Sequence, residues 1–289
     1  MKLRRSRLFI PGNNPRMIQT AKVFAPDVII LDLEDSVAPE NKDEARVLVK
    51  NALKHVDFGK SEVTIRVNPL EEGGYEDIEI INERVSAIVM PKVESLRDVE
   101  EMANALQGIE DKMERLGEIE IIATIESAKG LMNAREIAMG PRVTALSFGA
   151  EDYTRDIGGE RTKEGYETLF ARSMIVAAAK SAGIQALDTV YSDVNDLDGL
   201  YEDTLRSRKM GFDGRSAIHP SQVEVIHRAY TPSPEEIEWA KKVIEALEEG
   251  KKIGKGAVSL NGKMIDRPVA KRAERIISLA KAAGIVKED

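Results

Sequence analysis

Short apolar runs alternate along the chain with longer segments in which apolar residues recur at helical spacing. Several runs, such as residues 28–31 (VIIL) and 87–90 (AIVM), are apolar without interruption, which is typical of strands covered on both faces. The intervening segments carry helix-start signals: Asn14 before Pro15, and a capping box formed by Ser95 and Asp98. This alternation is the pattern of βα units and of a mostly parallel sheet.

Eight strands are predicted from the apolar runs. They cover residues 7–10, 28–31, 63–67, 87–90, 119–123, 143–148, 184–187 and 216–218, and a long amphipathic helix is predicted within 162–182. Eight strands with intervening helices favour a (β/α)₈ TIM barrel, an α/β fold, over an open doubly wound sheet. An open sheet would call for a glycine-rich phosphate turn, and the sequence has neither GxGxxG nor a Walker motif.

The pattern changes after Tyr230. Pro232 and Pro234 interrupt it, a charged helix is predicted over about 234–250, and a glycine-rich piece at 250–263 precedes a last helix over 268–283. We therefore predict a TIM-barrel catalytic domain over residues 1–230. Residues 231–289 form a C-terminal helical extension that we expect to pack on the barrel or on a neighbouring subunit.

Composition narrows the classes of function. The chain has 289 residues, 42% of them apolar, which is enough to bury one large core. Its net charge of −8 argues against a general nucleic-acid or anionic-membrane surface. The absence of cysteine excludes disulfides, thiolate metal sites and a cysteine nucleophile. No apolar run has the length of a signal-peptide core or a membrane span, so we expect a cytoplasmic protein.

Polar residues follow almost every predicted strand. They are Asp32, Glu34 and Asp35 after the second strand, Arg66 and Asn68 at the third, Lys92 after the fourth, Glu126 after the fifth, and Glu151 with Asp152 after the sixth. In TIM barrels the chemistry lies at the C-terminal ends of the strands, so these side chains are predicted to converge. Carboxylates that converge repel one another unless a cation or protons compensate, and oxygen ligands favour a hard divalent ion such as Mg²⁺.

Each of these residues also has a structural interpretation. A strand-end acid such as Glu126 can serve as a helix cap, Arg66 can be an ion-pair partner, and Lys92 can be a surface charge. His219 in AIHP is most simply a packed or helix-capping residue. With three histidines, no HExxH and no GxSxG, the sequence does not support a zinc hydrolase or a serine hydrolase.

The ordered motifs resemble the citrate lyase β-subunit family, within the malyl-CoA lyase and HpcH/HpaI aldolase superfamily. They are RLFIPGNNP, DLEDSV, IRVNP, MPKVES, ATIES, FGAEDYTRDIG, SDVND, GFDGRSAIHPSQ and SLNGKMIDRPV, and together they cover almost the whole chain. The resemblance implies a TIM barrel, Mg²⁺, and formation or cleavage of a carbon–carbon bond next to an acyl thioester.

For the metal site, the resemblance implies that Glu126 and Asp152 are the Mg²⁺ ligands. It places Glu34 and Asp35 nearby, as indirect or water-mediated partners of the ion. In the sixth-strand motif FGAED, the implied metal ligand Asp152 thus lies close behind the two small residues Gly149 and Ala150.

For the substrate, the resemblance implies that Arg66 binds the oxygens of an oxaloacetate-like portion, since its guanidinium is a permanently charged fork. Glu126 lies at the same portion, and Gly149 and Ala150 let backbone N–H groups approach a substrate carboxylate. The matching tail segment implies a catalytic proton donor or acceptor at Asp266, and the alternative interpretation of this residue is a helix N-cap. That tail can act on a neighbouring subunit of a homotrimer or homohexamer.

The resulting hypothesis is a lyase that cleaves a citryl thioester of CoA or of an acyl carrier protein, as the β-subunit of citrate lyase with α and γ partners. The motifs do not separate it from a stand-alone malyl-CoA or citramalyl-CoA lyase. A metal-dependent aldolase acting on free keto acids and a non-catalytic scaffold subunit remain further alternatives. The basic residues Lys42, Arg46 and Lys92 are candidates for contacts with a nucleotide or phosphopantetheine.

Overall fold

The computed structural model describes residues 2–114, 118–252, 257–260 and 262–286. These residues form two compact units. One unit is Arg4–His227, and the other combines the first residues of the chain with the segment that begins at Arg228.

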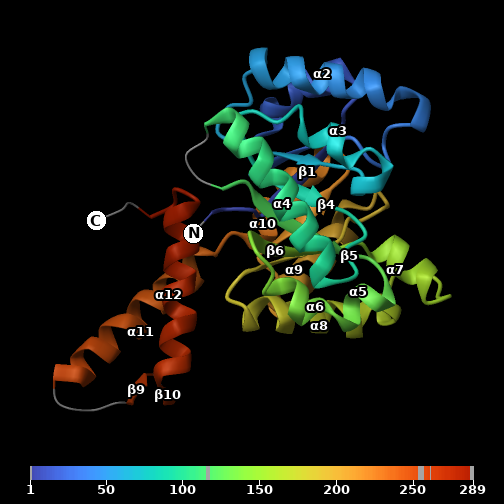
Figure 1. Ribbon diagram of the computed structural model, residues 1–289. Coiled ribbons are helices and arrows are strands. Elements are labelled where there is room, and N and C mark those ends of the chain that lie inside the picture. The colour runs from blue at the N-terminus through green and yellow to red at the C-terminus, as the bar shows by residue number, and fades with distance from the viewer. Residues whose placement is uncertain (1, 115–117, 253–256, 261, 287–289) are drawn as a thin grey trace. The chain divides into compact units, whose positions relative to one another are not determined.

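Eight parallel strands close into a barrel within Arg4–His227, with neighbours in the order β1 to β8 and with β8 paired to β1 (Figure 1). They are β1 (Ser6–Pro11), β2 (Val28–Asp32), β3 (Glu62–Arg66), β4 (Val85–Met90), β5 (Glu120–Ile125), β6 (Val143–Phe148), β7 (Gln185–Asp188) and β8 (Gly214–Ala217). The predicted (β/α)₈ barrel is thereby confirmed, and each predicted strand is present with its ends shifted by at most two residues.

Helices follow the strands and cover the outside of the barrel (Figure 1). They are α1 (Pro15–Thr20), α2 (Lys42–His55), α3 (Gly74–Ile78), α4 (Leu96–Met113), α5 (Ala128–Met132), α6 (Ala134–Ala138), α7 (Ala150–Asp156), α8 (Tyr166–Ser181), α9 (Leu197–Met210) and α10 (Ser221–Tyr230), with 3₁₀ turns η1 (Ala21–Phe24), η2 (Pro39–Asn41) and η3 (Leu70–Glu72).

Two predicted helix starts are confirmed in detail. Asn14 Oδ1 accepts a hydrogen bond from Met17 N (3.1 Å) with Pro15 in the first turn. Ser95 and Asp98 form the predicted reciprocal capping box, in which Ser95 N donates to Asp98 Oδ2 (2.9 Å).

The barrel interior is apolar in its middle and charged toward its N-terminal end. Residues at alternating positions of five strands, with Phe9 of β1, form one buried cluster: Val28, Ile30, Ala87, Val89, Ile122, Ala145 and Leu187. At the start of β1, buried Arg4 binds Glu62 through Nε (2.7 Å) and Glu120 through Nη2 (2.5 Å). The opposite end, where the strands terminate, is the end that carries the candidate site.

The C-terminal unit is a helical hairpin with a small antiparallel β-hairpin at its turn. Its elements are α11 (Pro234–Lys252), β9 (Val258–Leu260), β10 (Lys263–Ile265) and α12 (Arg267–Ala282), and α11 and α12 pack through Ala240, Val243, Ala273, Ile276 and Ala280. Of the predicted glycine-rich piece at 250–263, residues 253–256 and 261 lie outside the described residues. The predicted extension is therefore helical, whereas its packing on the barrel or on a neighbouring subunit stays a prediction.

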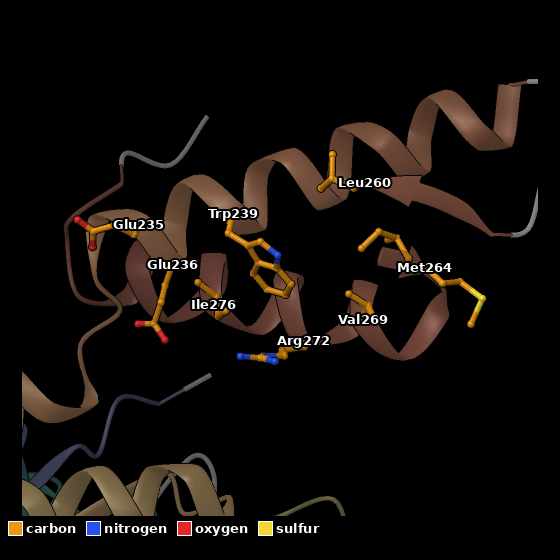
Figure 2. A pocket seen from close by; sticks show the side chains of 9 residues that line it. Glu235, Glu236, Trp239, Leu260, Met264, Val269, Arg272 and Ile276 are labelled. Atoms are coloured by element: carbon orange, nitrogen blue, oxygen red, sulfur yellow. The ribbon is translucent and has the colours of Figure 1, made fainter. Parts of the chain in front are cut away.

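A hollow of about 560 Å³ lies between the two helices and the β-hairpin of this unit (Figure 2). Trp239 points from α11 toward α12, and the Arg272 guanidinium lies 5.1 Å from the centre of its ring. Asp266 caps α12 by accepting a hydrogen bond from Val269 N (3.3 Å). In the described part of the chain, every helix is too short or too polar to span a lipid bilayer.

Candidate active site

A cavity of about 360 Å³ lies at the C-terminal ends of the barrel strands, and each strand lines it either with its own residues or with the residue that directly follows it. The strand residues that line it are Phe9, Asp32, Arg66, Thr124, Ser147, Phe148 and Ser216. The segments that follow the strands add Asp35, Ser36, Pro91, Glu126, Gly149, Ala150, Glu151, Asp152, Thr189, Val190 and Ile218. Most of the predicted site residues therefore meet at one cavity. Asp266 belongs to the C-terminal unit.

Arg66 organises the acidic side of this cavity. Its Nε and Nη2 donate to the two carboxylate oxygens of Asp32 (2.6 and 2.7 Å), and Nη1 lies 2.9 Å from Glu34 Oε2. Burial alone would raise the pKa of Asp32, but the hydrogen bonds and charge of Arg66 outweigh it and lower that pKa. Arg66 is thus an ion-pair partner, which is the structural role considered for it from the sequence. Its side chain also lines the cavity, and 16% of its surface is exposed.

Glu34 lies behind the cavity wall and Asp35 lies at its rim. Burial raises the pKa of Glu34 even though Arg66 and Lys92 stabilise its anion, and Lys92 Nζ lies 3.0 Å from Glu34 Oε1. Asp35 is exposed and lies 3.5 Å from Arg66 Nη1. Both acids are therefore near the site, and their contacts run to Arg66 and Lys92.

Glu126 is the buried carboxyl group at the centre of the site. Burial, with the negative charges of Asp152 and Glu34, raises its pKa to about 7. Lys92 N donates to Glu126 Oε1 (2.6 Å), and Lys92 adopts a left-handed backbone conformation (φ 53°), which is uncommon for a residue with a side chain. A site that forces a backbone into this conformation to bind one carboxylate is consistent with a functional role for that carboxylate.

Gly149 is small because Glu126 packs directly against it. A Cβ at this position would overlap the Glu126 carboxylate, so no other residue fits without moving the acid. The Gly149 amide donates to Ile125 O (3.0 Å) and the Ala150 amide donates to Thr189 Oγ1 (3.2 Å). Both N–H groups are thus bonded within the protein, and their predicted contact with a substrate carboxylate stays a prediction.

Asp152 lies in the first turn of α7 and opens onto the same cavity as Glu126. Its Oδ1 lies 2.6 Å from Nη2 of Arg155, and 26% of its side chain is exposed. Glu151, its neighbour, is bound on the surface to Arg161 (3.1 Å). Asp152 and Glu126 therefore line the same cavity, and the charge of Asp152 contributes to the raised pKa of Glu126. Glu151 has an exposed surface partner.

The donor set fits a hard divalent cation. A buried carboxyl group with a pKa near 7 beside a second carboxylate is stabilised as an anion when a cation binds between them. Among the described residues no three acidic or histidine side chains converge to form an all-protein metal cage. Mg²⁺ does not require one, because it is usually held by one or two carboxylates together with substrate oxygens and water.

Lys42 and Arg46 prove to be anchored to the protein. Lys42 Nζ donates to Leu33 O (2.7 Å), Glu34 O (2.7 Å) and Asn68 Oδ1 (2.8 Å), which uses all three of its hydrogens. Arg46 binds Asp77 (2.7 Å). A second cavity of about 670 Å³ borders these residues. Lys42 therefore fixes the loop that carries Glu34.

Some residues of the site were missed by reasoning from the sequence. Thr189 follows β7 directly and accepts a hydrogen bond from the Ala150 amide. Ser147 of β6 and Ser216 of β8 also line the cavity. The sequence signal that could have identified the two serines is a hydroxyl residue at a position of a barrel strand that faces the interior. His219 bonds Ser221 Oγ (2.8 Å) at the start of α10, which is the capping role expected for it.

Comparison with known proteins gives consistent matches. The family model described as HpcH/HpaI aldolase/citrate lyase matches residues 5–220. Citrate lyase subunit beta of Haemophilus influenzae is 44% identical, over 98% of this chain and 98% of that protein. The mitochondrial citramalyl-CoA lyase of Homo sapiens is 37% identical, over 96% of this chain and 85% of that protein.

A solved structure matches at the level of the fold and the sequence. Protein CitE from Mycobacterium tuberculosis, in complex with magnesium, acetoacetate and coenzyme A, superposes with a TM-score of 0.78 at 32% identity, covering 96% of this chain and 97% of that one.

Proposed function

The chain belongs to the HpcH/HpaI aldolase/citrate lyase family, and from this we propose that it is a carbon–carbon lyase that cleaves a citryl thioester to oxaloacetate and an acetyl thioester. The observation that carries the proposal is the pairing of buried Glu126 with Asp152 beside Arg66, in a cavity at the C-terminal end of the barrel. The 44% identity with a citrate lyase subunit beta supports the choice of acyl group.

The reaction requires charge to be stabilised on oxygen at both fragments. The tertiary hydroxyl of the citryl group loses its proton, and the bond between the hydroxyl-bearing carbon and the carbon next to the thioester breaks. The electron pair of that bond becomes the enolate of the acetyl thioester, while the hydroxyl carbon becomes the ketone of oxaloacetate. Protonation of the enolate carbon completes the reaction, so no oxidant or reductant is needed.

Glu126 and Asp152 are the residues that would hold Mg²⁺. When bound, Mg²⁺ supplies Lewis-acid stabilisation of the hydroxyl and carboxylate oxygens of the substrate. The relatives support this choice, since CitE of Mycobacterium tuberculosis was crystallised with magnesium. Glu34 and Asp35 act indirectly, because their contacts run to Arg66 and Lys92.

Arg66 complements the developing oxyanion. Asp32 holds two of its nitrogens in a bidentate pair, so the guanidinium is fixed in orientation before substrate binds. Gly149 and Ala150 shape the adjoining wall, where the Ala150 amide can exchange its long bond to Thr189 for a substrate carboxylate. The arrangement orients the oxaloacetate portion between Arg66 and Glu126.

Asp266 is proposed as the group that exchanges a proton with the enolate carbon. Its side chain caps α12 in the C-terminal unit, and a carboxylate can cap a helix and titrate. We propose that the unit serves the barrel of a neighbouring subunit in a homotrimer or homohexamer, which places Asp266 in trans.

The thioester carrier is CoA or an acyl carrier protein, with citrate lyase α and γ subunits as partners in the second case. The presence of coenzyme A with CitE of Mycobacterium tuberculosis supports a CoA-type substrate. We place the protein in the cytoplasm, consistent with the lack of cysteine.

The test is direct turnover. Purified protein is offered citryl-CoA, citramalyl-CoA and malyl-CoA with Mg²⁺, and released oxaloacetate, pyruvate and glyoxylate are quantified. The proposal predicts oxaloacetate from citryl-CoA at the highest kcat/KM. Faster release of pyruvate or glyoxylate would identify a citramalyl-CoA or malyl-CoA lyase instead, and no product from any thioester would refute cleavage by the isolated subunit.

A further inference from the structure

A fully buried arginine lies under the floor of the active-site cavity. Arg7 on β1 has no exposed surface. Its Nη1 donates to Ser147 Oγ on β6 (2.8 Å) and to Ser216 Oγ on β8 (3.2 Å). Because β6 is not a neighbour of β1 in the barrel, the contact with Ser147 crosses the barrel interior.

The charge of Arg7 is poorly compensated. Within the described residues, its Nε and Nη2 have no hydrogen-bond partner, and no acidic side chain forms an ion pair with it. Glu62 favours the cation from a distance but is bound to Arg4 (2.7 Å). Burial and the positive charges of Arg4 and Arg66 lower the pKa of Arg7 to about 9, so it is still a cation at pH 7.

A buried cation without a counter-ion is expected to destabilise the fold. Burying a cation without a partner has a desolvation penalty that is not offset by a counter-ion. An apolar side chain of similar length would fill the same space without that penalty. The structure therefore retains a destabilising charge directly beneath a cavity that we propose binds anions.

Ser147 and Ser216 connect this charge to the cavity. Both line the cavity, and both accept a hydrogen bond from Arg7. A serine hydroxyl that accepts from a cation keeps its own hydrogen to donate. Two hydroxyl donors that one cation polarises thus line the cavity.

We propose that Arg7, acting through Ser147 and Ser216, forms a subsite for a second carboxylate on the acyl portion of the substrate. The proposal rests on the proposed function, because it assigns the part of the acyl group that distinguishes a citryl from a citramalyl thioester. The citryl group carries a carboxymethyl arm where the citramalyl group carries a methyl group. Arg66 and the Glu126–Asp152 pair serve the hydroxyl and carboxylate that the two substrates share, which leaves the arm for the serine floor.

The experiment compares Arg7→Met, Ser147→Ala and Ser216→Ala with the wild type. The readouts are kcat/KM for citryl-CoA and citramalyl-CoA, inhibition by oxaloacetate and pyruvate, and thermal stability. Losing a hydrogen bond from a serine to the charged arm should lower the citryl-to-citramalyl ratio about 10- to 100-fold in Ser147→Ala and in Ser216→Ala. The ratio should fall in the same direction in Arg7→Met. Inhibition by oxaloacetate should weaken more than inhibition by pyruvate, and the melting temperature should stay equal or rise.

Thr64→Val is the matched control, because Thr64 is a buried barrel hydroxyl that donates only to Ile29 O (3.2 Å) and does not line the cavity. Its citryl-to-citramalyl ratio should equal that of the wild type. Equal losses for the two thioesters with a lower melting temperature would make Arg7 structural and overturn the proposal, as would an unchanged ratio. If Arg7→Met does not fold, the citryl-to-citramalyl ratios of Ser147→Ala and Ser216→Ala test the proposal, and unchanged ratios in both would overturn it.

Failure of the proposed function is separate from failure of this subsite. If the wild type cleaves neither thioester, the lyase proposal fails. Calorimetric binding of oxaloacetate and pyruvate to the wild type and to Arg7→Met then still measures the subsite, and equal discrimination by the two proteins would overturn it.

Discussion

Glu126→Gln should stabilise the metal-free protein while it abolishes activity. Glutamine keeps a carbonyl oxygen that can accept the hydrogen bond from Lys92 N, and it removes the buried negative charge. The wild-type pKa of about 7, in place of the ordinary 4.5, means that the folded state holds a proton that the unfolded state releases. The free energy of unfolding therefore falls as pH rises from 4.5 to about 7, and above about pH 7 it falls no further on account of Glu126.

The size of the effect follows from the same pKa. A displacement from 4.5 to about 7 corresponds to about 3 kcal/mol of unfolding free energy at pH 8 and to less than about 1 kcal/mol at pH 5. In EDTA at pH 8, Glu126→Gln should recover most of this lost unfolding free energy. In saturating Mg²⁺ the wild type should be more stable than Glu126→Gln, because the ion stabilises only the protein that binds it.

The assay is urea unfolding followed by circular dichroism at pH 5 and pH 8, with EDTA and with Mg²⁺. Circular dichroism is the suitable signal because the single tryptophan, Trp239, lies in the C-terminal unit and not in the barrel. Glu151→Gln, at an exposed acid lining the same cavity, is the matched control and should behave as the wild type. A Glu126→Gln protein with wild-type stability at pH 8 in EDTA, or with wild-type stabilisation by Mg²⁺, would refute the reasoning.

Four further predictions concern single residues. Asp152→Asn should lose Mg²⁺ affinity and turnover, and retention of both in a titration would contradict its role as a ligand. Arg66→Lys should lose most activity and about 1–3 kcal/mol of unfolding free energy, because lysine cannot form the bidentate pair with Asp32; full activity would show that Arg66 serves only the fold. Lys42→Met should lower kcat more than it raises KM by releasing the loop that carries Glu34, with Lys42→Arg recovering part of the rate, and an unchanged kcat would exclude positioning. Asp266→Asn should keep its melting temperature, since asparagine caps helices as well as aspartate, but lose activity, and subunit exchange with Asp152→Asn should restore part of it; no recovery after proven exchange would argue against a site shared between subunits.

Much of the fold follows from the sequence because its signals are local. Short, mainly apolar runs identified the eight strands, and the caps at Asn14 and Ser95 identified helix starts. Strand ends were less certain, by up to two residues, because pairing with neighbouring strands decides which residues join the ladder. Asp32 is an example: it extends β2 past the apolar run because it pairs with Arg66 of β3.

The candidate site followed from topology only in part. Since the carboxyl ends of parallel strands meet at one end of a barrel, Arg66, Glu126 and Asp152 could be predicted to converge from their order alone. The partners of these residues could not be predicted from the sequence. The spacing of Lys42 does not show that it anchors the loop that carries Glu34, and the spacing of Lys92 does not show that its backbone N–H donates to Glu126.

The sequence by itself determined the barrel, the helical extension and the set of acids at the strand ends, because periodicity and chain order are read along one dimension. Only the tertiary structure decided that Gly149 is small to admit Glu126, and that Arg7 meets Ser147 across the barrel interior. These contacts join strands that are distant in sequence, and burial that removes water sets their charges and pKa values. That environment exists only once the barrel has closed.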